Sequence, residues 1–232
     1  VVHLEAVDFD TEVVVDPVRF GQLRRALLPI LLDEVAEYLV LPDVGISESH
    51  AVAMAAGLAR EGLKPVVAIY STFMQRAFDQ CFEEVALQGL PVVLCMDRAG
   101  LVGSDGAVHH GFMDLAYLRP LPGMTIMAPA DERELSAMLD LALGLNGPAA
   151  IRYPRDEVPE AVSEEHLPVE MGRAARVAEG ADGTFLALGA MVEHALLAAE
   201  RLRDDGIEIG VVSARFVKPL DADLIAELLA AG

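Results

Sequence analysis

The sequence predicts an α/β protein in which a parallel sheet is flanked by helices. Short apolar runs rich in β-branched residues alternate with longer segments that carry apolar residues at helical spacing, which is typical of such sheets. Turns with Gly and Pro separate the two kinds of segment. The predicted strands of the first unit are residues 66–70, 92–96, 124–128 and 149–153. Two more strands follow, so we expect a second, apparently truncated α/β domain.

The amino-terminal part of the chain carries the weakest pattern. Residues 1–22 are expected to form an extended segment. Apolar residues at helical spacing over 23–41 predict a helix that Pro29 interrupts and Pro42-Asp43 ends.

The next predicted helix, from residue 48 to about Arg60, begins with Glu48 and continues with small apolar residues that allow close packing. This stretch alone leaves two interpretations of Glu48 open. It is an acid in the first turn that complements the helix dipole, or it is a buried acid that binds or protonates a ligand.

The remaining elements complete the domain plan. Ser71 and Thr72 are predicted to cap a helix that reaches about Gln88. Further segments are a loop at 97–111, a helix at 131–145, strands at 184–188 and 208–212, a helix at 192–203 and a last helix opened by Pro219-Leu220-Asp221. The predicted parts are the extended segment 1–22, an α/β domain over 23–157, an acidic linker over 158–170 and a partial second domain over 171–232.

Charge and composition exclude some partners. The net charge of −20 argues against nucleic acid and anionic membrane. It permits a phosphorylated small molecule, provided that the few arginines gather where the anion binds. Since no apolar run is long enough to span a membrane and no signal peptide opens the chain, we expect a cytoplasmic protein. Cys81 and Cys95 lie in apolar segments and are expected to be reduced core thiols.

Polar side chains cluster after three of the predicted strands. Ligands of open parallel sheets bind at the carboxyl ends of strands. That rule brings together Tyr70, Phe73 and Arg76 after the first strand, Asp97, Arg98, Asp105, His109 and His110 after the second, and Arg152 and Arg155 after the fourth. Each residue alone is unremarkable, because exposed arginines are usually solvated. Their shared location favours an anion-binding catalytic edge.

Five motifs in order carry a family resemblance. They are GISESHAV at 45–52, AIYSTFMQRAFDQ at 68–80, DRAGLVGSDG at 97–106, RYPR at 152–155 and RFVKPLD at 215–221. From about Asp43 onward the chain resembles the 1-deoxy-D-xylulose-5-phosphate synthase family. This resemblance implies a transketolase-like pyrimidine-binding domain followed by part of a transketolase carboxyl-terminal domain.

The resemblance also implies an activity. The family uses thiamine diphosphate with Mg²⁺ to condense pyruvate, with loss of carbon dioxide, and glyceraldehyde 3-phosphate. The product, 1-deoxy-D-xylulose 5-phosphate, feeds isoprenoid, thiamine and pyridoxal biosynthesis. Glu48 would hydrogen-bond the aminopyrimidine ring nitrogen and stabilise the imino tautomer that deprotonates the thiazolium carbon. Phe73 would stack on the pyrimidine.

Substrate roles follow from the same resemblance. Tyr70, Arg98 and Arg155 would bind the acceptor phosphate or the donor carboxylate, since guanidinium groups suit oxyanions. Arg76 is a further candidate for this role. Asp105 and His109 would orient the substrate and transfer protons.

The chain departs from the family in several places. The family binds diphosphate and Mg²⁺ on an amino-terminal domain through a Gly-Asp-Gly motif with a downstream Asn, and this motif is absent. We therefore expect no metal ligand here, no activity from this chain alone, and a homodimer built around the Glu48 helix. Ser47 stands for the usual Ala, Asp156 for the usual Gly, and His3 matches a family histidine only weakly. The start at Val1 suggests a fragment, a processed form or a missing start.

Two alternatives stay open. The chain could be the β-type subunit of a two-chain thiamine diphosphate enzyme, either a 2-oxo acid dehydrogenase or a transketolase. A partner carrying the diphosphate motif would favour that. It could also be a non-catalytic dimerisation or regulatory module. Whether it binds thiamine diphosphate with Mg²⁺ separates the module from the enzymes.

Overall fold

The structure is a computed structural model that describes residues 38–40, 46–103, 105–155, 159, 161–163 and 167–231. The segment 1–22, His3, Pro42-Asp43 and most of the predicted helix over 23–41 lie outside these residues. The end of that helix prediction is wrong, because Tyr38–Val40 form strand β1. These three residues pair in parallel with residues 64–66, from Tyr38 opposite Lys64 to Val40 opposite Val66. A short apolar run fits either period, and here strand pairing decides.

The main sheet confirms the predicted fold class. Its strand order is β1, β2 (Lys64–Tyr70), β3 (Val93–Asp97), β5 (Ala149–Arg152), β4 (Thr125–Met127) and β9 (Phe216–Lys218). The first five strands run parallel, and β9 adds an antiparallel edge beside β4. The central strands are buried, as the β-branched runs predict.

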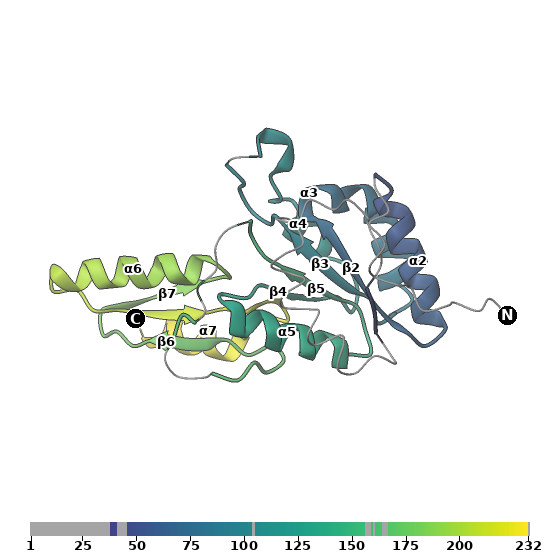
Figure 1. Ribbon diagram of the computed structural model, residues 1–232. Coiled ribbons are helices and arrows are strands. Elements are labelled where there is room, and N and C mark those ends of the chain that lie inside the picture. The colour runs from purple at the N-terminus through teal and green to yellow at the C-terminus, as the bar shows by residue number, and fades with distance from the viewer. Residues whose placement is uncertain are drawn as a thin grey trace. The chain divides into compact units, whose positions relative to one another are not determined.

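Helices cover both faces of this sheet (Figure 1). Helix α2 (Glu48–Arg60) has the predicted bounds and buries its small residues against the sheet. Helix α5 (Glu132–Gly144), on the other face, is capped by Asp131, whose side chain accepts a hydrogen bond from the Glu134 amide. Across the helices that the structure describes, none combines the length and the apolar character needed to cross a membrane.

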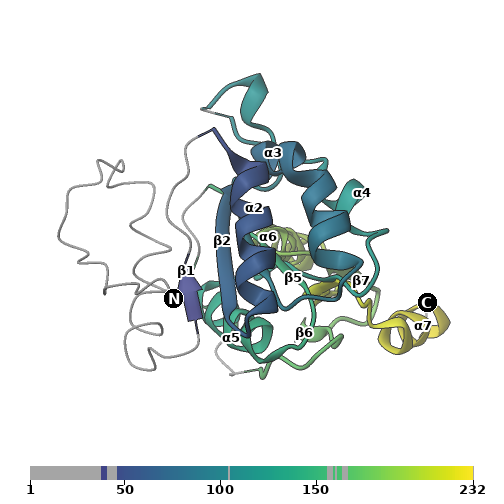
Figure 2. The ribbon, with the colours of Figure 1, turned by 90° about the vertical axis from the view of Figure 1, so that its right-hand side faces the viewer.

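The predicted regular helix over 71–88 is wrong in detail. The chain forms α3 (Ser71–Met74), a 3₁₀ turn η1 (Gln75–Ala77) and a π-helical segment η2 (Gln80–Ala86). The Ser49 hydroxyl in α2 donates a hydrogen bond of 2.6 Å to the Arg76 carbonyl and so ties the 3₁₀ turn to α2. Departures of this kind from α-helical pitch are frequent at functional sites. Figure 2 shows α2 and α3 on the same side of the sheet.

The carboxyl-terminal region forms a second α/β sheet. Strand β8 (Ile209–Ser213) pairs antiparallel with β6 (Ala175–Ala178) and parallel with β7 (Gly183–Ala187). Helices α6 (Met191–Asp204) and α7 (Ala222–Ala231) match predicted helices. Sequence patterns missed β6, β9 and the short helices α4 (Asp114–Leu118) and η3 (Ala107–His109), because runs of three to five residues are too short to show a period.

A buried ion pair connects the second region to the first. The Arg215 Nε donates to Glu134 Oε1 over 2.6 Å, and its terminal nitrogens donate to the carbonyls of Leu167 and Pro168. Arg215 itself adopts a left-handed backbone with φ of 56°. This side chain therefore links α5, residues 167–168 and the segment that leads into β9.

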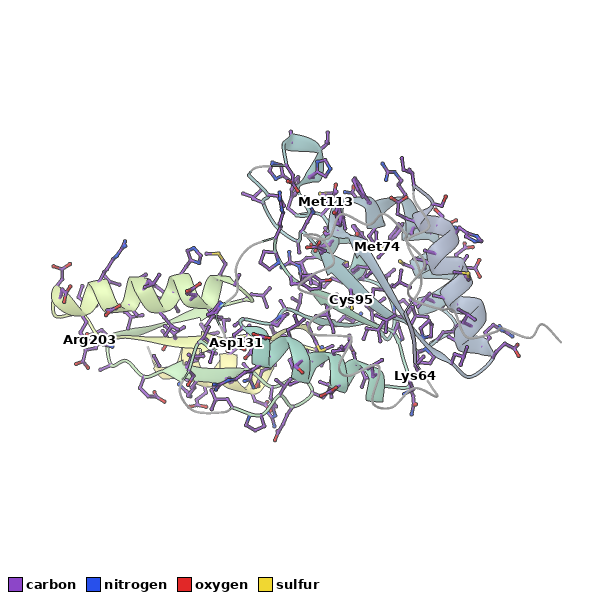
Figure 3. All side chains as sticks on the ribbon, in the orientation of Figure 1. Lys64, Met74, Cys95, Met113, Asp131 and Arg203 are labelled. Carbon is purple, nitrogen blue, oxygen red and sulfur yellow. The ribbon has the colours of Figure 1, made fainter. Side chains whose placement is uncertain are left out.

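Cys81 and Cys95 are free and buried, as predicted, and Figure 3 places Cys95 within the main sheet. Burial raises the pKa of each thiol to about 12. The reactive thiolate is therefore scarce at pH 8 in the folded protein. We expect iodoacetamide to leave both thiols unmodified until a denaturant is added, as mass spectrometry would show. Rapid labelling of the native protein would contradict their burial.

The same two pKa values set an expected pH dependence. Above pH 9 the unfolded chain releases thiol protons that the folded chain keeps, so the unfolded state binds fewer protons and the free energy of unfolding falls as pH rises. The double variant Cys81→Ala, Cys95→Ala should lose less stability than the wild type between pH 8.5 and 10.5 in urea titrations. Parallel curves for the two proteins would argue against this linkage.

Candidate active site

Strand register brings the predicted residues to one edge of the main sheet. Tyr70, the last residue of β2, lies opposite Asp97, the last residue of β3, and Met96 lies opposite Arg152 at the end of β5. The loop that carries η3 projects beyond this edge, next to α3 and α4 (Figure 1). The rule for parallel sheets therefore places the candidate residues as the sequence predicts.

Glu48 is the first residue of α2 and only 5% exposed. Its Oε1 accepts a hydrogen bond of 2.8 Å from Arg76, whose side chain is half exposed. A position in the first turn also suits the helix dipole, so the structure combines both interpretations of this residue. Each carboxylate oxygen can accept more than one hydrogen bond, so Glu48 keeps capacity to accept others beside that from Arg76.

An aromatic group lies next to this carboxylate. The rings of Tyr70 and Phe73 stack with centroids 5.4 Å apart, and His109 meets Phe73 edge-on at 5.5 Å. The Arg76 guanidinium lies 4.9 Å from the Phe73 ring centroid. Arg76 thus contacts both Glu48 and Phe73, and it shows that this carboxylate and this ring together accept a planar group with N–H donors.

Two arginines share one carboxylate on the other side of Tyr70. Arg98, which is 2% exposed, lies 4.2 Å from the Tyr70 ring centroid and forms an ion pair with Asp105. Arg155, whose side chain is 45% exposed, pairs with the same carboxylate. Two guanidinium groups around one carboxylate leave a net positive charge. The Asp105 contacts show that the arginine pair accepts an oxyanion at this place.

The contacts of His109 and Arg98 fix their orientation. The His109 Nδ1–H donates to the Asp105 carbonyl over 2.8 Å, so Nε2 is the proton acceptor in the neutral ring. Arg98 adopts a left-handed backbone with φ of 59°, and its amide donates to Asp97 Oδ1 over 2.6 Å. His110 has a structural role, since its Nδ1 accepts a hydrogen bond from the Val102 amide.

Ser71 and Thr72 do not cap the helix as predicted. The Ser71 hydroxyl donates to the Gly111 carbonyl over 3.1 Å, and Thr72 donates to the Val108 carbonyl over 3.4 Å. Tyr70 is the residue before α3, without a side-chain cap. Both hydroxyls therefore hold the loop after β3, because its carbonyl groups lie within their reach.

All eight candidate residues form one connected set of contacts. The set runs from Glu48 through Arg76, Phe73 and Tyr70 to Arg98, Asp105 and Arg155, with His109 between Phe73 and the Asp105 backbone. Sequence reasoning missed Gly111 and Asp114, which hold the loop. The turn-like Gly pair at 100 and 111 is the one signal that could have pointed to the first.

Metal-binding groups are not found in the described part of the chain, where no group of three or more His, Cys, Asp or Glu side chains is arranged to hold an ion. The site therefore offers a buried carboxylate, an aromatic face and an oxyanion pair. It can bind a planar nitrogen heterocycle and an anionic substrate.

Comparisons with known proteins agree with this site and fold. The family model for the pyrimidine-binding domain of transketolase matches residues 33–160, and the model for the transketolase carboxyl-terminal domain matches residues 172–232. The chain therefore belongs to the transketolase family. The resemblance within that family to 1-deoxy-D-xylulose-5-phosphate synthases is also confirmed by its curated relatives.

Two such relatives carry the name 1-deoxy-D-xylulose-5-phosphate synthase. The protein of Rhodopirellula baltica is 54% identical over 190 residues, which are 82% of this chain and 30% of that protein. The protein of Magnetococcus marinus is 56% identical over 186 residues, 80% of this chain and 30% of that protein. The chain thus spans about a third of the length of these relatives.

Solved structures show the same fold. A structure titled split gene transketolase, inactive beta4 tetramer, matches with a TM-score of 0.81 and 30% identity, covering 92% of this chain and 76% of that chain. Transketolase from Campylobacter jejuni matches with a TM-score of 0.74 and 21% identity, covering 85% of this chain and 35% of that one.

Proposed function

We propose that this chain is the pyrimidine-binding and substrate-binding part of a 1-deoxy-D-xylulose-5-phosphate synthase. The reaction is the thiamine diphosphate-dependent condensation of pyruvate, with decarboxylation, and glyceraldehyde 3-phosphate. The observation that carries this proposal is the connected set of contacts between a buried carboxylate, an aromatic ring and an arginine pair at one sheet edge. The curated relatives support the choice of substrates.

The described residues fit the pyrimidine end of the cofactor. Glu48 and Phe73 already hold the planar Arg76 guanidinium, and an aminopyrimidine offers similar N–H donors and a similar flat face. When bound, thiamine diphosphate supplies the carbon nucleophile needed to decarboxylate a 2-oxo acid. Mg²⁺ and the diphosphate would be held by residues on a further domain.

The chain's own residues then have distinct tasks. Glu48 accepts a hydrogen bond from the pyrimidine ring nitrogen and holds the ring in place. Arg98 and Arg155 bind the phosphate or carboxylate of a substrate in place of the Asp105 carboxylate, and Tyr70 packs against Arg98. His109 presents Nε2 to accept or deliver a proton, because its Nδ1–H is held by the Asp105 carbonyl.

A split enzyme is a second candidate, favoured by one comparison. This chain covers 76% of a split gene transketolase that is described as an inactive tetramer of β subunits. The same comparison supports the expectation that this chain needs a diphosphate-binding partner or domain. It suggests a tetramer as well as the homodimer that we propose, both with cytoplasmic location.

The test uses the complete enzyme, meaning this chain together with a diphosphate-binding domain, in the same polypeptide or as a partner. With thiamine diphosphate, Mg²⁺, pyruvate and glyceraldehyde 3-phosphate, we expect carbon dioxide and 1-deoxy-D-xylulose 5-phosphate, detected by mass spectrometry. Ketose phosphate donors should give no product. The reverse preference would identify a transketolase, and acyl transfer to a lipoyl group would identify a 2-oxo acid dehydrogenase.

The isolated chain is expected to show no turnover in the same assay. Most of the charge of the cofactor lies on its diphosphate, which needs Mg²⁺ and oxygen ligands, and the net charge of −20 repels an unneutralised diphosphate. Steady carbon dioxide release from the 232 residues alone would show that they contain a diphosphate site.

A further inference from the structure

The loop between β3 and α4, residues 98–113, carries Asp105 and His109 but buries few of its own apolar side chains. Leu101 is 80% exposed, Val108 is 74% exposed and Phe112 is 60% exposed. Burial of these side chains therefore does not fix the loop. Its position depends on polar contacts at its two ends.

The base of the loop is closed by backbone contacts. Gly100 and Gly111 exchange two hydrogen bonds of 2.9 and 2.7 Å. A Cβ on Gly111 would lie 2.4 Å from the Arg98 carbonyl and 2.5 Å from the Ser71 hydroxyl, so only glycine fits here. These contacts join the two ends of the loop to each other but leave open what holds the loop to the sheet.

The end of β5 holds both ends of the loop. On the incoming side, the Ala99 amide donates to the Tyr153 carbonyl over 3.0 Å. On the outgoing side, Arg152 Nε donates to Asp114 Oδ2 over 2.9 Å, and Arg152 Nη2 lies 3.5 Å from Oδ1. Arg152 and Tyr153 are adjacent. Two consecutive residues of one strand end therefore fix the entrance and the exit of the loop.

The ion pair is buried. Asp114 is fully buried, and the Arg152 side chain is 15% exposed. Asp114 Oδ1 also accepts a hydrogen bond of 2.7 Å from the Leu115 amide and so holds the start of α4. Figure 3 shows Met113, the residue before Asp114, near Met74 of α3. A guanidinium group engaged in this way is poorly placed to bind a substrate anion, unlike Arg98 and Arg155.

We infer that Arg152 and Asp114 are positioning residues, which hold the loop so that Asp105 and His109 meet Arg155 and Phe73. The catalytic part of this inference rests on the proposed function. The link is direct, because Arg155 lies three residues after Arg152 on the same segment and pairs with Asp105 in the middle of the loop. Sequence reasoning placed Arg152 at the anion-binding edge, and the structure assigns it a different task.

The test removes both charges together. Arg152→Met alone would leave a buried carboxylate without its partner, which is strongly destabilising. The double variant Asp114→Asn, Arg152→Met avoids this, and the side-chain oxygen that remains at position 114 can still accept from the Leu115 amide. The matched control is Glu227→Gln, Arg176→Met, which removes an exposed ion pair of 2.7 Å in the second region.

Amide hydrogen exchange by mass spectrometry and steady-state kinetics are measured on the complete enzyme. In the Asp114/Arg152 variant we expect exchange over residues 99–113 to rise about tenfold or more, with helix α6 unchanged as an internal reference. We expect kcat/KM to fall up to about 10²-fold, the scale of a misplaced reacting group. The control variant should match the wild type in both measurements.

The outcomes separate the two levels of the inference. Unchanged exchange over 99–113 overturns the positioning role, whatever the activity. Raised exchange with wild-type kcat/KM overturns its catalytic consequence. Raised exchange in the variant, with no product even from the wild type, supports the positioning role and refutes the proposed function.

Discussion

The Glu48→Gln variant of the complete enzyme is expected to fold normally and to lose about 10²-fold or more in kcat. The carboxylate is 5% exposed and lies at the start of α2, so an amide of the same size keeps the packing. Its Oε1 accepts a hydrogen bond from Arg76, and a glutamine oxygen can still accept that bond. What the amide lacks is the negative charge that would polarise the pyrimidine ring of the cofactor.

The measurement compares kcat, the KM for pyruvate and the thermal midpoint of the variant with those of the wild type. Glu193→Gln, in the first turn of α6, is the matched control, because it makes the same substitution at a helix start far along the chain. The control should be fully active. Near-wild-type turnover by Glu48→Gln would remove this residue from the mechanism and leave only its contribution to the helix dipole.

The sequence predicts the fold of this chain well where a segment is long and buried. The runs that form β2, β3 and β5 are apolar and β-branched, and the carboxyl-end rule then places Tyr70, Arg98 and Arg155 at one edge. The alanine-rich pattern of α2 gives its bounds to the residue. These features are local, so a single sequence carries them.

Features that depend on distant partners escaped the sequence. Strand β9 exists because Phe216–Lys218 pair with β4, about ninety residues earlier in the chain. Ser71 has the composition of a helix cap, yet its hydroxyl is taken by the Gly111 carbonyl, forty residues away. Arg152 resembles a third anion-binding arginine until Asp114 is placed against it. Each of these cases needed the packed structure.

The second large effect concerns anion recognition. In the complete enzyme, Arg155→Ala and Arg98→Met should each raise the KM for glyceraldehyde 3-phosphate by about 10²-fold and leave the KM for pyruvate much less changed. Truncating a charge-assisted contact costs a few kcal/mol, roughly 2–3, and the loss falls on the substrate that makes the contact. Methionine is chosen at the buried position 98 because it preserves most of the side-chain volume beside Tyr70.

Arg173→Ala is the control, since this arginine is 56% exposed and pairs with Asp221 in the second region. It should leave both Michaelis constants unchanged. The Asp105 carboxylate already contacts both arginines, so inorganic phosphate should inhibit the wild type competitively against the acceptor and inhibit the Arg155→Ala variant far less. Equal increases in the KM of both substrates, together with unchanged phosphate inhibition, would assign the arginine pair to the structure of the loop and not to the acceptor phosphate.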